Sequence, residues 1–441
     1  MDVLIVGAGP TGLALAVDLA RRGVPVRIVD REIFAGSRGK GLQLRTLEIL
    51  DDLGVLDAIN AAGRSTGGRI YMGGKVVRET PAGASLIIPQ WSVNEALTDR
   101  LSSLGITVET AEVTSFEQDA GGVTAHTASG EAIRAKFMIG CDGGRSTIRK
   151  QLGVPFDGET EEQQMMHIGD FEVEGLTNDG MHMWIDPDRG MFALTPFKAT
   201  KVWQCQVAPV PGEPSLETFQ RLCTEFTGRT DIKLSNPTWM STYRENVRMV
   251  SRFRVGRVFL AGDAAHVHPP AGGLGMNTGI QDAYNLGWKL ARTLDGTASP
   301  TLLDTYEQER LPVAAWTLRS SSQAMTDIKD AITSGTGAID KGIKPEHRQL
   351  GIGYPDSPLS KNLVTWDGPQ AGERAPWQDL VKGTGFTLLA FGCAARPIPG
   401  VQTHELPGEE NVLVLVRPDG YIGMVAAPDD WKSVVDYAGR P

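Results

Sequence analysis

The chain has 441 residues, 41% of them hydrophobic and 22% charged, which suits two or three folded domains and excludes intrinsic disorder for the bulk of it. Lys and Arg number 43 against 53 Asp and Glu, a net charge of −10 without a basic stripe, and this excludes a typical nucleic-acid-binding protein. No apolar run is long enough for a transmembrane helix, no signal peptide precedes the first motif, and the four cysteines form no C-x-x-C pair, so we expect a cytoplasmic protein with free thiols and no membrane partner.

The N-terminal segment carries the pattern of a dinucleotide-binding unit. An apolar run over 3–6 predicts a strand buried on both faces, and a second strand over 24–29 ends at Asp30. The turn and helix start between them contribute Gly7, Gly9, Pro10, Thr11 and Gly12, with the glycines at G-x-G-x-x-G spacing. The first glycine permits a tight turn, the second lets the backbone approach a pyrophosphate, and the third lets the helix pack on the strand. The acid at the end of the second strand can bind ribose hydroxyls, which makes an ordinary glycine-rich turn the weaker interpretation, but FAD and NAD are not distinguished.

The next elements lead to a second acidic motif. Residues 92–104 predict a helix that starts with the capping box Ser92-x-x-Glu95. An apolar strand over 137–139 runs into Asp142-Gly143, and Ser146 is the expected N-cap of a short helix.

Residues from about 155 to 252 read mostly as strands. Short apolar runs over 181–185 and 191–196 flank a turn. The segment 202–207 alternates with period two, as a half-buried strand does.

A third motif follows a strand near residue 260. Gly262-Asp263 leads into the loop 270–277 and a long amphipathic helix over 278–294. The local pair His266-x-His268 lacks carboxylate or cysteine partners at metal-ligand spacing, so we expect no metal. No G-x-S-x-G elbow is present, so hydrolase chemistry has no support.

Together these three motifs resemble the single-component FAD-dependent aromatic hydroxylases, the group of para-hydroxybenzoate hydroxylase and phenol hydroxylase, with the nearest likeness to aromatic polyketide hydroxylases. Trp288-Lys289-Leu290-Ala291 and Tyr306-Glu307-x-Glu309-Arg310 extend the resemblance to about residue 312. It implies an α/β fold with a Rossmann-like FAD-binding domain, an inserted, mainly antiparallel β-sheet substrate domain, and a small thioredoxin-like C-terminal domain that lacks the C-x-x-C pair. The expected boundaries are 1–75, 90–155 and 253–335 for the FAD-binding domain, 76–89 and 156–252 for the substrate domain, and 336–441 for the linker and C-terminal domain.

The resemblance also implies roles for single residues. Asp263 would bind the ribityl side of FAD as a buried carboxylate, and Asp142 would contact both the flavin and a nicotinamide cofactor. Arg45 would lie near the flavin and pocket, although a surface arginine paired with a carboxylate is an equal alternative. The loop along the isoalloxazine ring and this arginine give the catalytic candidates Arg45, Pro270, Gly273 and Gly275. The cofactor-binding candidates are Gly7, Gly9, Pro10, Thr11, Gly12, Asp30, Arg31, Arg38, Gln90, Asp142, Gly262, Asp263, Gly273, Leu274 (where relatives often have Gln), Gly275, Met276 and Asn277. The substrate-pocket candidates are Trp184, Phe192, Leu194 and Trp203, each of which is also a good candidate for plain sheet core.

The implied reaction uses bound FAD, transiently bound NADPH or NADH, O₂ and a small aromatic substrate. A hydride reduces the flavin, and a flavin C4a-hydroperoxide then transfers OH to a phenolic or polyketide ring, as in antibiotic biosynthesis. Baeyer–Villiger oxygen insertion, a drug-inactivating monooxygenase and a non-catalytic flavin-fold binding protein stay open as alternatives. A flavin halogenase is disfavoured because its W-x-W-x-I-P signature is absent. The substrate, and the choice between monomer and homodimer, are left undetermined.

Overall fold

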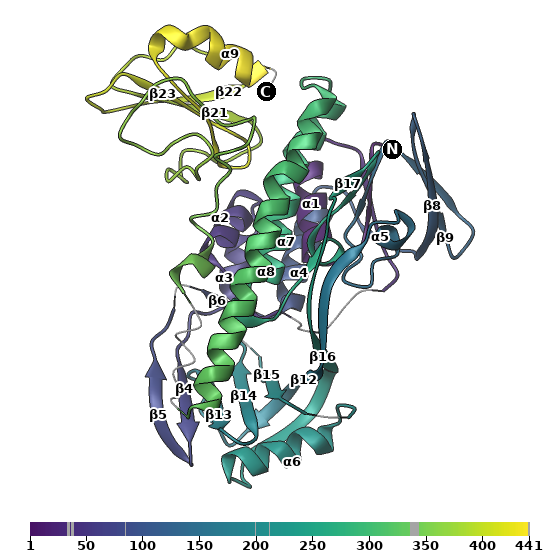
Figure 1. Cartoon of the computed structure of the whole chain (residues 1–441). Helices are drawn as coiled ribbons and strands as arrows, with labels where there is room; N and C mark the ends of the chain where they lie inside the picture. The colour runs from purple at the N-terminus through teal and green to yellow at the C-terminus, as the bar shows by residue number, and fades with distance from the viewer. Residues whose placement is uncertain are drawn as a thin grey trace.

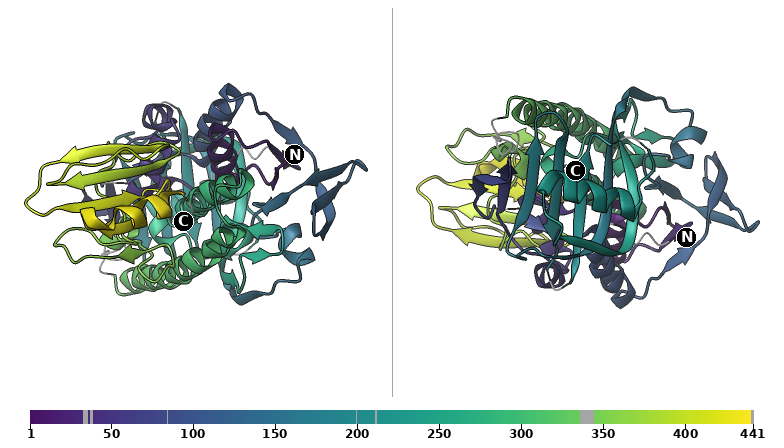
Figure 2. Two further views of the ribbon diagram at one scale, coloured as in Figure 1. Left: turned by 90° about the horizontal axis from the view of Figure 1, so that it is seen from above. Right: turned by 90° about the horizontal axis from the view of Figure 1, so that it is seen from below.

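Figure 1 shows the computed structural model of the chain, which describes residues 1–32, 36, 39–83, 85–198, 200–210, 212–335 and 344–439. Two large sheets lie at opposite ends of a body of helices, and the C-terminal segment forms a further sheet beside them (Figures 1 and 2). The long helix α8 (Asp304–Thr333) runs from the first large sheet to the second.

The six-stranded sheet has the N-terminal strand inside it. In spatial order its strands are β17 (Arg254–Val255), β18 (Val258–Leu260), β11 (Phe137–Gly140), β1 (Val3–Val6), β2 (Val26–Asp30) and β7 (Val108–Thr110). All neighbours are parallel except β17 and β18. Helix α1 (Pro10–Arg21) joins β1 to β2 and packs against α7 (Gly275–Leu294). The apolar runs of β1 and β11 are buried throughout because helices cover the sheet, as the sequence predicted for a parallel sheet.

Smaller elements surround this sheet. The helices are α2 (Leu44–Asp52), α3 (Leu56–Ala62), α4 (Gln90–Ser103) and α5 (Thr147–Gln151), the three-stranded sheet holds β8 (Val113–Asp119), β9 (Gly122–Thr127) and β10 (Ala132–Ala135), and β3 (Gly41–Leu42) pairs with β6 (Leu86–Ile87). The predicted N-cap at Ser146 is confirmed, because its Oγ accepts from the amide of Arg149 at 2.9 Å. The predicted capping box at Ser92 is wrong: α4 already begins at Gln90, after Pro89, and Ser92 lies inside the helix.

The eight-stranded sheet carries a helix on each face. In spatial order its strands are β19 (His266–Val267), β16 (Lys233–Val250), β12 (Phe156–Glu174), β15 (Val202–Ala208), β14 (Gly190–Pro196), β13 (Met181–Asp186), β4 (Gly68–Met72) and β5 (Lys75–Thr80). Helix α6 (Leu216–Thr227) packs on one face, and α8 packs on the other (Figure 1). Because β4 pairs with β13, the boundary that we expected after residue 75 cuts the β4–β5 hairpin and falls too late in the chain.

The C-terminal segment forms a mixed sheet with one helix. The strands are β20 (Lys361–Asn362), β24 (Ile422–Ala426), β23 (Val412–Val416), β21 (Phe386–Phe391) and β22 (Val401–Leu406) in spatial order, followed along the chain by α9 (Trp431–Gly439). The pairs β21–β22 and β20–β24 are parallel and the other pairs antiparallel. The likeness of this unit to thioredoxin stays a prediction.

A buried ionic cluster ties this sheet to the helices. We call Lys289, Glu309, Arg417 and Asp419 the C-terminal joint; their side chains are at most 1% exposed. Glu309 accepts from Lys289 at 2.7 Å and from Arg417 at 2.6 Å, and Arg417 also contacts Asp419 at 2.5 Å. Burial alone would raise the pKa of Glu309, but the charges of Arg417 and Lys289 hold it well below its usual value. The charged groups of the joint therefore pair with one another, and none is left to bind a ligand.

Candidate functional site

Three glycines at the start of α1 have different surroundings. A Cβ on Gly7 would lie 2.3 Å from the carbonyl oxygen of Cys141, and one on Gly12 would lie 1.9 Å from that of Gly7. Gly7 also has φ +110°, a backbone conformation that favours glycine. A Cβ on Gly9, in contrast, would meet nothing within 4 Å. Two of the glycines are thus required by packing, whereas Gly9 borders open space.

The first turn of α1 is free to bind an anion. Gly9 is the N-cap residue, none of the described side chains caps the helix, and Pro10 stands at its first position. The amide groups of such a turn lack intrahelical acceptors and attract phosphate. Thr11 has a packing role, because a Cβ on Gly262 would lie 2.6 Å, and one on Gly279 2.3 Å, from its hydroxyl oxygen. We call this turn, with the segments 262–264 and 268–277, the cradle.

Asp30 lies at the end of β2, beside the glycine turn. Its Oδ2 accepts from the amide of Ala8 at 2.6 Å, which holds the carboxylate next to the start of α1. Arg31 follows with its side chain 66% exposed and forms a surface ion pair with Glu32. Arg38, another of the cofactor-binding candidates, lies outside the described residues.

The second acid of the cradle differs from expectation. Asp263 lies in the 3-10 turn Gly262–Ala264 directly after β18, and it is exposed rather than buried. The buried carboxylate of this region is Asp282 on α7, which accepts from the Gly262 amide at 3.0 Å and contacts His266 Nε2 at 2.7 Å. Arg310 donates to its other oxygen at 2.7 Å. Asp282 thus fixes the turn and leaves Asp263 on its outer side; the spacing of the motif gave no signal for this residue.

The backbone of the loop before α7 is shaped so that a ligand could approach it closely. Gly272 and Gly273 have φ +78° and +63°, and α7 begins at Gly275 without a side-chain cap. Leu274 is fully buried, so its side chain supports the loop from inside. Asn277 joins this loop to another part of the chain: its Oδ1 accepts from the Gln43 amide at 2.8 Å.

Next to the loop lies a buried histidine, His268. Its Nδ1 contacts the carbonyl oxygen of Pro269 at 2.9 Å, while Nε2 faces Gly275 and has no hydrogen-bond partner among the described residues. The side chain is 8% exposed, and burial lowers its pKa to about 4. The ring is therefore neutral near pH 7 and presents an acceptor toward the start of α7.

Two further candidates are held by their own neighbourhood. Gln90 Oε1 accepts from the Gly39 amide at 3.2 Å and so fixes the segment that runs along the cradle. Asp142 accepts from Ser146 Oγ at 2.5 Å and from the Thr147 amide at 2.7 Å, and thereby closes the start of α5; burial raises its pKa. A flavin or nicotinamide contact of Asp142 stays a prediction.

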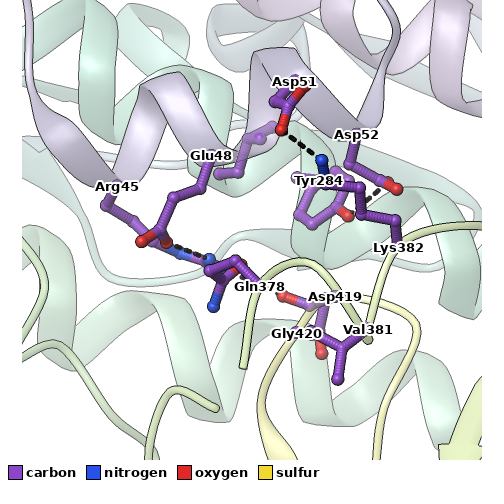
Figure 3. A pocket seen from close by; sticks show the side chains of 11 residues that line it. Arg45, Glu48, Asp51, Asp52, Tyr284, Gln378, Val381, Lys382, Asp419 and Gly420 are labelled. Carbon is purple, nitrogen blue, oxygen red and sulfur yellow. Dashed lines mark hydrogen bonds and ion pairs between the residues drawn. The ribbon is translucent and has the colours of Figure 1, made fainter. Parts of the chain in front are cut away.

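The structure places Arg45 against the C-terminal segment, and its expected position near the flavin stays a prediction. Arg45 is 2% exposed, pairs with Glu48 at 2.8 Å, and donates to the carbonyl oxygen of Asp419 at 2.7 Å. Figure 3 shows it at the hollow between α2, α7 and the C-terminal segment. The volume of that hollow is about 30 Å³, which suits a water molecule rather than a substrate. Arg45 therefore attaches the C-terminal segment to α2.

The aromatic candidates of the eight-stranded sheet point away from the cradle. Trp184, Phe192, Leu194 and Trp203 pack with Phe219 and Leu222 of α6 in one core cluster, so they are sheet core and not pocket lining. The opposite face holds Met183, Ile168 and Ala193, which pack with Ile332 of α8. Successive side chains of a strand alternate between the two faces of a sheet. All four candidates therefore lie on the same face, which is the one that α6 covers.

The comparisons with known proteins agree with one another. A family profile described as "FAD binding domain" matches residues 1–321. A "Flavin-dependent monooxygenase" of Mycobacteroides abscessus is 41% identical over 485 aligned positions, with all of both chains covered. A "12-dehydrotetracycline 5-monooxygenase/anhydrotetracycline 6-monooxygenase" of Streptomyces rimosus is 33% identical, covering 97% of this chain and 96% of the relative. The crystal structure of aklavinone-11 hydroxylase with FAD and aklavinone has a TM-score of 0.84 at 26% identity and covers 99% of this chain and 98% of that one.

Among the described residues, no helix combines the length and the apolar character that crossing a bilayer requires.

Proposed function

This chain belongs to the FAD-binding-domain family of flavin-dependent aromatic monooxygenases, and on that premise we propose that it hydroxylates a phenolic, polyketide-like aromatic compound with O₂ and NAD(P)H. The observation that carries the proposal is that the glycine loop before α7 contacts residues 39–41, and that Lys40 in this segment donates to Thr195 and Gln206 of the eight-stranded sheet. These two residues lie on the face of the sheet on which α8 packs. An aromatic compound on that face would lie next to the flavin.

The residues of the cradle suit FAD. The uncapped first turn of α1 and the open space at Gly9 fit a pyrophosphate, and Asp30 fits a ribose. Asp263 would contact the ribityl chain, and the backbone of 273–275 would lie along the ring. When bound, FAD supplies the redox chemistry with NAD(P)H and O₂. The chain binds and orients the reactants and excludes water, which otherwise competes for the activated oxygen.

The reaction is tested with the FAD-loaded protein, NADPH or NADH, ¹⁸O₂ and a panel of anhydrotetracycline, aklavinone and simple phenols. We expect one labelled oxygen in a product, located by mass spectrometry on an aromatic carbon. A label inside an enlarged ring would indicate Baeyer–Villiger insertion instead. The absence of any label, and of substrate-dependent NAD(P)H oxidation, would contradict the proposal.

Cofactor binding is tested with Asp263→Ala, which should leave the protein folded but weaken FAD binding at least about tenfold, that is by about 1.4 kcal/mol. The exposed acid Asp57 offers the matched control, Asp57→Ala, with normal flavin content. Wild-type flavin content in Asp263→Ala would remove Asp263 from the site.

A further inference from the structure

A lysine lies between the cradle and the eight-stranded sheet. Lys40 directly precedes β3, in the segment that runs along the loop before α7. A Cβ on Gly39 would lie 3.6 Å from the terminal methyl group of Met276, and Asn277 donates to the carbonyl oxygen of Gly41 at 2.9 Å. Both neighbours of Lys40 are thus in contact with the loop that would border the flavin ring.

The side chain of Lys40 reaches across to the sheet and binds neutral groups. Its Nζ donates to Thr195 Oγ1 at 3.0 Å on β14 and to Gln206 Oε1 at 2.6 Å on β15. Within the described part of the chain, no carboxylate forms an ion pair with it; Asp170 on β12 acts on it only as a more distant charge. An ammonium group has three N–H donors, so these two bonds leave one for a ligand.

The sheet is apolar next to one acceptor and polar next to the other. Gln206 pairs across the strands with Ala193 on one side and Ile168 on the other, whereas Thr195 pairs with Gln204, which in turn pairs with Asp170. These residues belong to the face on which α8 packs. Lys40 thus lies beside the apolar Ile and Ala side chains that flank Gln206, a combination that matches an aromatic ring that carries a negative oxygen.

We propose that Lys40 binds the ionised ring oxygen of the substrate, so that this enzyme oxygenates aromatic compounds with an acidic hydroxyl group. The inference rests on the proposed monooxygenase function and names its substrate class. A partly desolvated ammonium with neutral partners gains from an anion, because the two charges compensate each other away from water. An ionised hydroxyl group also makes the ring more electron-rich and thus more reactive toward an electrophilic oxygen.

The charge of Lys40 is sensitive to pH. Burial lowers its pKa to about 8, against the opposing influence of Cys205 and Asp170, while Thr195 and Gln206 are not ionised. The lysine is thus mostly charged at pH 7 and becomes neutral as the pH rises through about 8. A bound phenolate would extend the charged range upward, and anion affinity should fall once that limit is passed.

The test measures binding and needs no turnover. 4-Nitrophenol serves as the probe because its anion absorbs visible light, and 4-nitroanisole is its non-ionisable analogue. With FAD-loaded protein in excess, difference spectra across the pH range give the ionisation of the bound probe. The variants are Lys40→Met, which removes the charge, Lys40→Arg, which keeps it, and Lys201→Met at an exposed lysine just before β15 as the control.

In the wild type and in Lys201→Met, we expect bound 4-nitrophenol to ionise about one pH unit or more below the free probe. Lys40→Met should abolish this shift and weaken anion binding at least about tenfold, Lys40→Arg should restore much of it, and 4-nitroanisole should bind all four proteins alike. Equal shifts in the wild type and Lys40→Met, or no binding of 4-nitrophenol, would overturn the proposal. A protein that shows the shift but forms no ¹⁸O-labelled product would instead contradict the proposed function.

Discussion

The cradle and the C-terminal joint differ in whether their polar groups are already paired within the protein. In the cradle, two helix starts have no side-chain cap, glycines replace side chains at the closest approaches, and Asp263 is exposed. In the joint, four ionic side chains are at most 1% exposed and bind one another. The comparison shows that the two regions differ in what their polar groups bind. The cradle has backbone amide donors available for a ligand, whereas the charged side chains of the joint pair with one another and hold two parts of the chain together. Changes in the joint should therefore affect stability, and changes in the cradle should affect binding.

The largest expected effect is on the joint. Glu309→Gln would leave Arg417 and Lys289 without their shared carboxylate in a site closed to water. We expect a loss of about 3–5 kcal/mol in the free energy of unfolding, measured by urea denaturation. Glu225→Gln, in an exposed pair with Arg221, is the control and should change it by less than about 0.5 kcal/mol. Similar losses in both variants would mean that the joint is not a special source of stability.

The buried histidine of the cradle, His268, should make the free energy of unfolding depend on pH in the acid range. The pKa of His268 is about 4 in the folded chain against 6.5 for an ordinary histidine. The unfolded chain therefore binds more protons between these values, and the stability that is present above about pH 6.5 is lost as the pH falls through about 4, by up to about 3 kcal/mol. His268→Gln should flatten this part of the stability curve, whereas the same change at His126, which reaches solvent, should not. A curve that is unchanged in His268→Gln would show that the buried ring does not cause the loss.

A substitution at Gly9 should change FAD binding without changing the stability of the protein. A Cβ there meets nothing in the protein, so Gly9→Ala should leave the unfolding midpoint unchanged while the methyl group obstructs the pyrophosphate. We expect FAD affinity to fall at least about tenfold, or about 1.4 kcal/mol, in a flavin fluorescence titration. Gly351→Ala, at another glycine with open space, is the control. If Gly9→Ala binds FAD like the wild type, the cofactor does not approach this turn.

The smallest effect is expected at the rim of the joint. Lys382 pairs with Asp51 at 2.6 Å across the hollow in Figure 3, and both side chains are more than a third exposed. Solvent screens such a pair, so Lys382→Met should cost less than about 1 kcal/mol. A loss as large as that of Glu309→Gln in thermal unfolding would show that the contact between the two regions depends on its rim rather than on its buried charges.

The sequence predicted the elements of the cradle well because its signals are local. The strand, glycine turn, helix and acid over 3–30 follow one another along the chain, and the structure has them in that order. The position of Arg45 depends instead on Asp419, 374 residues away, which no local pattern records.

The pocket side of the sheet was missed for a related reason. The period of two groups Trp184 with Phe192 and Leu194, but only the placement of α6 shows that this group is the covered core. Lys40 and Asp282 carry no motif of their own and are recognised only by their contacts.

The strand order of the six-stranded sheet has a consequence for biosynthesis. β1 and β2 leave the ribosome almost together, but the other edge of β1 pairs with β11, which appears about 130 residues later, and β11 in turn waits for β18 at residues 258–260. Pairing across such sequence separations is slow, and an unpaired strand edge invites association with other chains. During translation, the strands that carry the glycine fingerprint are therefore made long before their sheet can be completed, and a nascent chain that ends before residue 258 carries the fingerprint on an unfinished sheet.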